Sequence, residues 1–483
     1  MGLGILGANT ESAVYQVSNS LRFNDNDDPK LQRTTGSNSA RDRFTFAAWV
    51  KKAQDTGADQ TLFSANDGGH QPHIKFDNTT EQLNVRISDS AGYNVKTSRS
   101  FRDVAAWYHI VVAMNTQQDT AADRIKIYVN GVQETSFSTS DYPAENYNSA
   151  FNSNTEHTLG RDVTSDNKPF DGYMAEVYWI DGLQLDPTYF GKFNSNNVWI
   201  PVEKDKGAGG AITFGTHGFY FEFKQTGTGT NSSGMGADTS GNDNHFAVTN
   251  LQTDGRNVTT DTPTNNFITL NPLATNSRGT FSDGNTKVTL NLQGSDPYGQ
   301  IEFGTFAVNK GKWYYEVYVV ENGAGGQVAI GWNERWEGGS YTNGHNNLGS
   351  NGNAWYGDDG QIKIGSATTQ STGVDTFADT DIIGCAIDLD NNKVYWHKNG
   401  NYQDDPTPAP ASNNGRSLGT ATYNNYWTPW VSKDSDNSSH NPTLNFNFGN
   451  GINVPSSGNA DANGYGNFEY AVPSGFYSLC TKN

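Results

Sequence analysis

The sequence is poor in cysteine, in positive charge and in long apolar runs. Its two cysteines, Cys385 and Cys480, are too few for a disulfide framework in 483 residues, so we expect two buried free thiols rather than one bridge. Lysine and arginine number 32 against 51 aspartate and glutamate, a net charge of −19. This charge argues against binding to duplex nucleic acid or to anionic membranes through phosphate neutralisation. No apolar run reaches the roughly 18 residues of a membrane span, and the first residues lack the basic and apolar regions of a secretory signal.

Small polar residues and aromatics make up the balance of the composition. Charged residues are 17% of the chain, aromatic residues are 12%, and there are 53 glycines. Runs rich in β-branched and aromatic residues recur between clusters of Gly, Asn and Asp, and none keeps a 3.6-residue period over the length of an ordinary helix. The sequence therefore predicts an all-β fold built from antiparallel β-sandwich (jelly-roll) domains.

Turn and cap signals give local detail within this fold. The pairs Asn130-Gly131 and Asn399-Gly400 each follow a strand-like run and predict tight β-hairpins. A single short helix is expected over residues 185–193, because Asp186 is a good N-cap residue and the proline after it fits the first helical position.

A shift in composition divides the chain into two halves. Residues 226–297 are dominated by Gly, Thr, Asn and Ser, and we expect them to form a connecting segment. This predicts an N-terminal arm over residues 1–20, a first sandwich over 21–225 and a second sandwich over 298–483.

The first half carries an ordered series of motifs: FTFAAWVK, AWYHIVVAMNT, RIKIYVNGV and FDGYMAEVYWID. In this order they resemble the laminin-G-like, concanavalin A-like jelly-roll domain. The second half resembles a SPRY domain. Its motifs are GKWYYEV from Gly311, DIIG from Asp381, WTP from Trp427 and NFG from Asn447.

The combination of these domains points to a particular class of protein. Together with the phrases GADTSGNDNHFAVTNL and PSGFYSLCTKN, it resembles virion proteins of marine tailed phages. The resemblance implies a tail fibre or surface fibre that binds a host-surface glycan or protein multivalently, as a homo-oligomer for which we expect a trimer. Such a protein is made in the host cytoplasm without a signal peptide and resides in the virion. The alternative is a purely structural component, in capsid decoration or a tail adaptor, that binds other virion proteins; neither role involves nucleic acid or membrane insertion.

Catalysis would require paired carboxylates. Glycoside hydrolases of the concanavalin A-like fold that retain the configuration of the anomeric carbon place two carboxyl groups about 5–5.5 Å apart. The motif of the related β-glucanases begins Glu-x-Asp and is completed by a further Glu. Only Glu203-Lys204-Asp205 has the Glu-x-Asp spacing, and no Glu follows it at the required position. Glu176 and Asp181 have odd spacing, so on one strand they face opposite sides of the sheet. We therefore expect a non-catalytic protein, and a polysaccharide-degrading enzyme is the least favoured alternative.

Aromatic residues beside Gly, Asn and Asp in the second half are candidate ligand contacts. Exposed rings can stack on the apolar face of a sugar, while neighbouring amides bond its hydroxyl groups. The candidates are Trp332, Trp336, Trp355 and Tyr356. The alternative is that these side chains pack in the core or at a subunit contact, as we expect of the core residues Trp313 and Trp396.

Metal binding rests on weaker signals. Calcium takes six to eight oxygen ligands, which Asp-rich loops can supply, and Asp67 in the loop NDGG is the candidate calcium ligand. The alternative is that Asp67 only forms a turn. His70 and His73 could share a metal, although a solvated loop is the default interpretation. No other cofactor is predicted.

Overall fold

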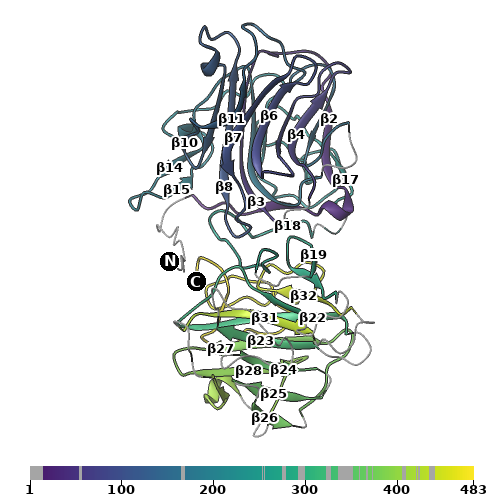
Figure 1. The fold of residues 1–483 in the computed structure, drawn as a ribbon, viewed down its shortest axis with the longest axis vertical. Helices are drawn as coiled ribbons and strands as arrows, with labels where there is room; N and C mark the ends of the chain where they lie inside the picture. Colours follow the sequence, from purple (N-terminus) through teal and green to yellow (C-terminus); the bar gives the residue numbers. More distant parts are fainter. Residues whose placement is uncertain are drawn as a thin grey trace. The chain divides into compact units, whose positions relative to one another are not determined.

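In the computed structural model nearly all of the regular secondary structure is β-strand, which accounts for 43% of the residues against 3% in short helical turns (Figure 1). The chain divides into two compact units, residues 9–266 and residues 267–481. The described residues are 15–53, 57–164, 169–252, 254, 256–274, 279–291, 300–322, 328–334, 352–357, 359–365, 368–372, 374–404, 409–419, 421, 425–433 and 441–483.

The first unit is a sandwich of two eight-stranded sheets, as the motifs predict. In sheet A the strands lie in the order β10 (Val132–Gln133), β9 (Ile125–Val129), β8 (Tyr108–Asn115), β3 (Arg43–Lys52), β13 (Gly172–Asp181), β1 (Ser20–Phe23) and β18 (Val258–Thr259), and β16 (Phe219–Phe221) pairs with β13. In sheet B the order is β11 (Phe137–Asp141), β7 (Tyr93–Ser100), β6 (Gln82–Ser88), β5 (His73–Phe76), β4 (Gln60–Asn66), β12 (Glu156–Leu159), β2 (Lys30–Thr34) and β17 (Ala247–Thr249). All of these pairings are antiparallel.

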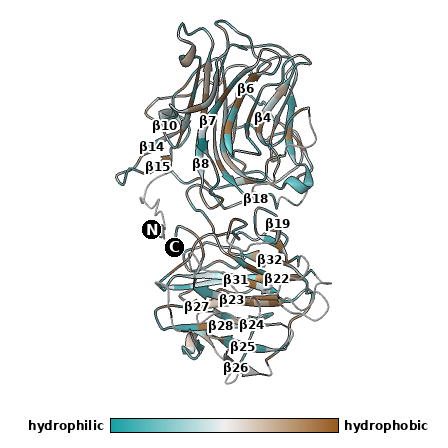
Figure 2. Ribbon diagram, viewed as in Figure 1, coloured by the Kyte–Doolittle hydropathy of each residue, from teal (hydrophilic) through white to brown (hydrophobic). Residues whose placement is uncertain are grey.

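Alternation along the strands builds the core between the two sheets. Hydrophobic and hydrophilic bands alternate along β6 in Figure 2, and its Leu83, Val85 and Ile87 are fully buried. The centre of the core is aromatic, because the ring of Trp179 lies 4.6 Å from that of Phe44 and 4.7 Å from that of Phe63 between ring centroids. Large aromatic side chains of this kind dominate the burial energy of such a core.

The outward face of sheet A is also covered. Apolar side chains of residues 185–214, including Leu185, Phe190 and Phe214, pack on Tyr178 and Ile180 of β13. This covering segment contains the hairpin of β14 (Gly191–Phe193) and β15 (Trp199–Pro201). It explains why every residue of β13 is buried.

Local predictions for the first sandwich are confirmed in part. Asn130 and Gly131 have φ values of 48° and 78°, the left-handed conformation that a tight hairpin between β9 and β10 needs. Asp186 caps a helix as predicted, and its carboxylate accepts a hydrogen bond of 2.8 Å from the backbone N–H of Thr188. The helix is a single 3₁₀ turn, η3 (Pro187–Tyr189), because β14 begins two residues later. The other short 3₁₀ turns are η1 (Asp25–Asp27), η2 (Ala121–Asp123) and η5 (Pro410–Ser412).

The second unit is a sandwich of a nine-stranded and a six-stranded sheet. In sheet C the order is β19 (Thr280–Ser282), β20 (Lys287–Thr289), β32 (Thr443–Asn447), β22 (Lys312–Glu321), β27 (Ile382–Asp388), β28 (Lys393–Lys398) and β29 (Asn401–Tyr402), while β30 (Arg416–Ser417) pairs with β28 and β33 (Tyr477–Ser478) with β22. In sheet D the order is β21 (Gln300–Phe303), β31 (Trp427–Lys433), β23 (Val328–Glu334), β24 (Gly352–Tyr356), β25 (Gln361–Ile364) and β26 (Thr368–Thr372).

The core of the second sandwich matches the sequence predictions. Trp313 on β22 is 7% exposed and Trp396 on β28 is fully buried, and both lie in the main apolar cluster. Cys385 and Cys480 are buried free thiols, as expected. Asn399 and Gly400 have φ values of 49° and 83° in the predicted hairpin between β28 and β29.

The predicted domain boundaries need correction. The composition of residues 226–297 suggested a connecting segment, but β17 and β18 extend the two sheets of the first sandwich, and β19 and β20 extend sheet C of the second. The unit boundary falls between Asn266 and Phe267. The described end of the predicted N-terminal arm also belongs to the first sandwich, because Tyr15 and Val17 pack on the outward face of sheet A. Edge strands of Gly-, Thr- and Asn-rich sequence look like loops until a sheet edge is available to pair with them.

Candidate functional site

Three of the four aromatic residues predicted to contact a ligand are buried. Trp332, Trp355 and Tyr356 each have 0% exposed surface. Trp332 packs edge-on against Tyr315 with ring centroids 5.1 Å apart, and Trp355 packs edge-on against Phe377 at 5.3 Å. The prediction of an exposed ligand surface at these residues is therefore wrong, and the alternative of core packing holds.

The error has a structural cause. The Gly and Asn residues beside these aromatics suggested loops, but Trp332 lies on β23 and Trp355 and Tyr356 lie on β24, two inner strands of sheet D. Trp332 and Trp355 face the main core, while Tyr356 faces a second apolar cluster on the opposite side of the sheet. Trp336 lies outside the described residues.

Asp67 is held by cationic and N–H donors. Its Oδ2 lies 3.1 Å from Nη2 of Arg41, and its Oδ1 accepts hydrogen bonds from the backbone N–H groups of Gly69 and His70. Partial burial opposes ionisation, but the hydrogen bonds from Gly69 and His70 win and lower the pKa of Asp67 below its ordinary value. A carboxylate directed at a guanidinium and at N–H groups does not fit a calcium ligand set. Its role as a turn former is the one that the geometry supports.

The two histidines of the same loop are separated. His73 is buried on β5, whereas His70 is partly exposed in the loop between β4 and β5. In the described part of the chain, no three His, Cys, Asp or Glu side chains come together as a metal site would require.

A cluster of polar and aromatic side chains surrounds Asp67 at one end of the first sandwich. We call it the rim cluster and define it as Arg41, Asp67, His70, Tyr93 and Tyr147. His70 Nδ1 lies 3.1 Å from Asp67 Oδ1, its ring meets that of Tyr147 edge-on at 6.2 Å, and Tyr147 meets Tyr93 edge-on at 4.8 Å. None of the five is fully buried.

Different loops bring the rim cluster together. Arg41 precedes β3, Asp67 and His70 lie between β4 and β5, Tyr93 begins β7, and Tyr147 follows β11. Arg41 is fixed further by the hydrogen bond of 2.6 Å that its Nε donates to the carbonyl of Ser149. Loops held by a rigid sandwich are where binding residues commonly gather.

The chemistry of the rim cluster suits a polar, hydroxyl-bearing ligand. The rings of Tyr93 and Tyr147 pack partly against the apolar core of the sandwich, and the hydroxyl of Tyr147 is buried, so their exposed parts offer mainly an apolar face. The Arg41–Asp67–His70 network offers N–H donors and carboxylate acceptors whose positions are already fixed, which lowers the entropic cost of binding. The sequence signal for this cluster was limited to Asp67 and His70, because nothing in the chain order links Arg41, Tyr93 and Tyr147 to them.

The two carboxylates of β13 face opposite sides of the sheet, as predicted. Asp181 accepts hydrogen bonds from Asn152 Nδ2 and from the backbone N–H of His217, each at 3.0 Å. Glu176 accepts from the hydroxyl groups of Tyr15 at 3.0 Å and Tyr220 at 2.6 Å. The two carboxylates share no partner, so they do not form a pair across a common substrate space.

Glu176 has an unusual local setting. It occupies a β-bulge in β13, where the register with β3 shifts, and its φ is 49°. It is 3% exposed, and burial raises its pKa to about 7 in spite of the hydrogen bonds from Tyr220 and Tyr15 that favour its charged form. It anchors Tyr15 to the outward face of sheet A.

Comparison with known families identifies both domain types. Residues 25–186 match the family model of the concanavalin A-like lectin/glucanases superfamily, and residues 312–418 match the SPRY domain model. The chain therefore contains a concanavalin A-like domain followed by a SPRY domain, as the motifs predicted. Among the described residues, no helix is long and apolar enough to cross a membrane.

Solved structures with similar folds cover parts of the chain. The SPRY domain of human HERC1 is 15% identical, with a TM-score of 0.27, and the match covers 38% of this chain and 96% of that one. The heptameric SAP-like pentraxin of Limulus polyphemus is 13% identical, with a TM-score of 0.28 and coverage of 36% and 80%. A putative carbohydrate-binding protein of Bacteroides ovatus is 14% identical, with a TM-score of 0.30 and coverage of 49% and 58%. Identities and TM-scores this low assign no ligand or partner to this chain. A search of curated proteins finds no significant match.

Proposed function

We propose that this chain is a non-catalytic virion protein of a tailed phage, in a tail fibre or surface fibre, that binds a host-surface glycan or protein. The observation that carries the binding role is the rim cluster, which presents tyrosine rings beside a fixed network of donors and acceptors. The phage origin rests on the resemblance of the linker and C-terminal phrases to marine phage virion proteins. The protein resides in the virion and is made in the host cytoplasm.

Multivalency supplies the affinity. A single rim cluster offers few contacts and binds weakly, but in a homo-oligomer, for which we propose a trimer, later contacts are effectively intramolecular. The net charge of −19 keeps crowded copies soluble. The non-catalytic assignment is supported by Glu176 and Asp181, the carboxylates of β13, which face opposite sides of their sheet and are occupied by internal hydrogen bonds.

The test is an adsorption competition with matched variants. Purified full-length protein is added to host cells before the phage whose virion contains the chain, and free phage is counted. We expect dose-dependent loss of adsorption with the natural protein and with Phe193→Ala, which removes an exposed aromatic outside the rim cluster. Tyr147→Ala should leave the melting temperature within a few degrees and weaken competition by about tenfold, because it removes the ring shared by Tyr93 and His70.

Other outcomes would redirect the assignment. If saturating protein leaves adsorption unchanged and labelled protein does not bind cells, the chain is a structural component that contacts other virion proteins. Release of reducing ends from host polysaccharide by the purified protein would overturn the non-catalytic assignment.

A further inference from the structure

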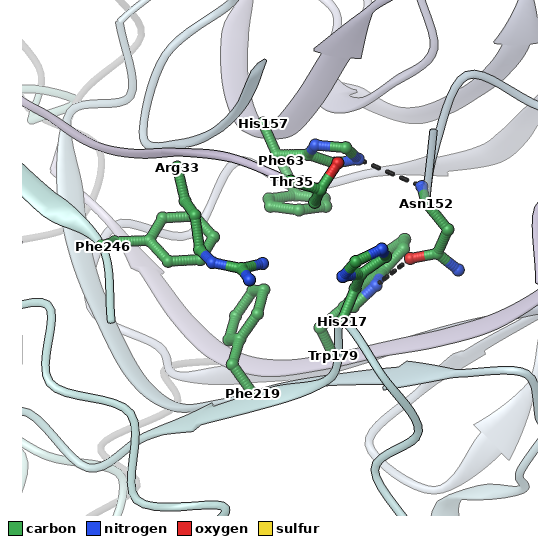
Figure 3. A pocket seen from close by; sticks show the side chains of 9 residues that line it. All are labelled: Arg33, Thr35, Phe63, Asn152, His157, Trp179, His217, Phe219 and Phe246. Atoms are coloured by element: carbon green, nitrogen blue, oxygen red, sulfur yellow. Dashed lines mark hydrogen bonds between the residues drawn. The ribbon is translucent and has the colours of Figure 1, made fainter. Parts of the chain in front are cut away.

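A pocket lies between the two sheets of the first sandwich (Figure 3). The space that can hold the centre of a water-sized group is about 10 Å³, enough for a single water molecule, and all of the empty space in the pocket, open solvent included, is about 210 Å³. Strands of both sheets and the segments beside them contribute to its lining: Arg33, Thr35, Phe63, Asn152, His157, Trp179, His217, Phe219 and Phe246.

Most polar groups of this pocket are already satisfied. The indole N–H of Trp179 donates to Oδ1 of Asn152 at 2.8 Å, and the backbone N–H of Asn152 donates to Nε2 of His157 at 3.1 Å. The other ring nitrogen of His157 bonds the carbonyl of Thr155, and the hydroxyl of Thr35 bonds the carbonyl of Ser153. Burial lowers the pKa of His157 to about 4, so its ring is neutral at pH 7. These bonds fix the walls of the pocket.

His217 leaves one ring nitrogen without a partner. Its side chain is buried, at 5% exposure, and Nε2 lies 2.9 Å from the carbonyl oxygen of Ser37. A carbonyl oxygen only accepts hydrogen bonds, so Nε2 carries a proton and donates, and in the neutral ring Nδ1 is then an acceptor. Within the described part of the chain nothing donates to Nδ1. A buried acceptor of this kind requires a water or a ligand hydroxyl.

Arg33 supplies the opposite chemistry. Its half-buried guanidinium enters the pocket (Figure 3), and the described residues give it no hydrogen bond or ion pair. Asp238 attracts it from a distance, but the carboxylate of Asp238 is occupied by the N–H groups of Tyr220, Ser240 and Asn244. A guanidinium stays charged in proteins and matches a carboxylate bidentately.

We propose that this pocket binds a carboxylate that has a neighbouring hydroxyl group, as in a uronic acid unit of an acidic glycan. Arg33 donates to the carboxylate, His217 Nδ1 accepts from the hydroxyl, and the rings of Phe219 and Phe246 border the apolar part of the ligand. One polar group of the ligand fills the water-sized space, and the rest of the ligand lies in the part of the pocket that is open to solvent. The pocket is lined by none of the rim-cluster residues, so this inference stands apart from the proposed host-surface role.

The test is a calorimetric titration of the full-length protein with soluble probes. Methyl β-D-glucuronide carries the proposed chemistry, methyl β-D-glucoside lacks the carboxylate, and lactate represents a free hydroxy acid. We expect saturable binding of the glucuronide and no binding of the glucoside. Arg33→Gln should weaken binding by about 10- to 100-fold, the effect of losing a charge-assisted hydrogen bond. Arg99→Gln is the matched control, because Arg99 lies on β7 outside the pocket and pairs with Glu134.

The outcomes distinguish between the possible sources of the ligand and show whether the proposal holds. Binding of lactate as tight as that of the glucuronide would keep the chemistry and indicate a free hydroxy acid as the ligand. Equal binding of the glucoside, equal affinity after Arg33→Gln, or no saturable binding below about 10 mM would overturn the proposal. None of these results depends on cells or phage, so failure here is distinct from failure of the host-surface role.

Discussion

Replacement of Glu176 by glutamine should abolish a specific part of the pH dependence of stability. Burial raises the pKa of this carboxyl from 4.5 to about 7 in the folded protein. A group whose pKa is raised by folding contributes its stability in full below the unfolded value, and that contribution is lost as the pH rises through the folded value. The relevant window is therefore pH 4.5 to 7.

The magnitude follows from the same shift. The difference of about 2.5 units corresponds to roughly 3.5 kcal/mol at about 1.4 kcal/mol per unit, of which about 3 kcal/mol falls between pH 4.5 and pH 8. The wild-type first sandwich should lose this amount of unfolding free energy between pH 4.5 and pH 8 because of Glu176 alone. Glutamine keeps the shape of the side chain and an acceptor for Tyr220 and Tyr15 but does not titrate. The unfolding free energy of the variant should therefore rise relative to that of the wild type as the pH rises.

The assay compares the two proteins across pH. Urea unfolding of the full chain at pH 4.5, 6 and 8 gives the difference in unfolding free energy between wild type and Glu176→Gln, and other titrating groups cancel in that difference. Glu222→Gln is the control, because Glu222 is near Glu176 but pairs with Lys224 at the surface. A difference that stays constant with pH within about 1 kcal/mol would refute the account of Glu176.

Two further predictions concern the second sandwich. Trp332→Ala should cost about 3–5 kcal/mol of unfolding free energy, since it empties a fully buried site against Tyr315; an unchanged urea midpoint would contradict the placement of Trp332 in the core. Cys385 should resist a thiol reagent in the folded protein and react once urea unfolds it, because burial raises the pKa of its thiol and excludes the reagent. Rapid labelling of Cys385 in native buffer, read out by mass spectrometry of its peptide, would show that this strand opens.

Local chemistry was sufficient to predict much of the fold. Strand periodicity and aromatic content gave the all-β class, and the Asn-Gly pairs at 130–131 and 399–400 predicted hairpins because both positions require positive φ. Asp186 was identified as a helix cap because capping is also a local interaction, made with a backbone N–H group two or three residues further along the chain. Trp313 and Trp396 were correctly placed in the core from the strands that carry them.

The tertiary structure decided what these local signals could not. Whether Trp332 and Tyr356 face solvent depends on where β23 and β24 lie in their sheet, and both are inner strands there. The rim cluster and the Arg33 pocket join residues that are far apart in the chain, such as Arg41 with Tyr147 and Arg33 with His217. Their proximity follows from strand order and loop packing, so it is a property of the folded sandwich that residue types and spacing do not encode locally. The sequence by itself determined the strongly apolar strands and the tight Asn-Gly turns, while pairing across the sheets determined the Gly-, Thr- and Asn-rich edge strands and which side chains remain available to a ligand.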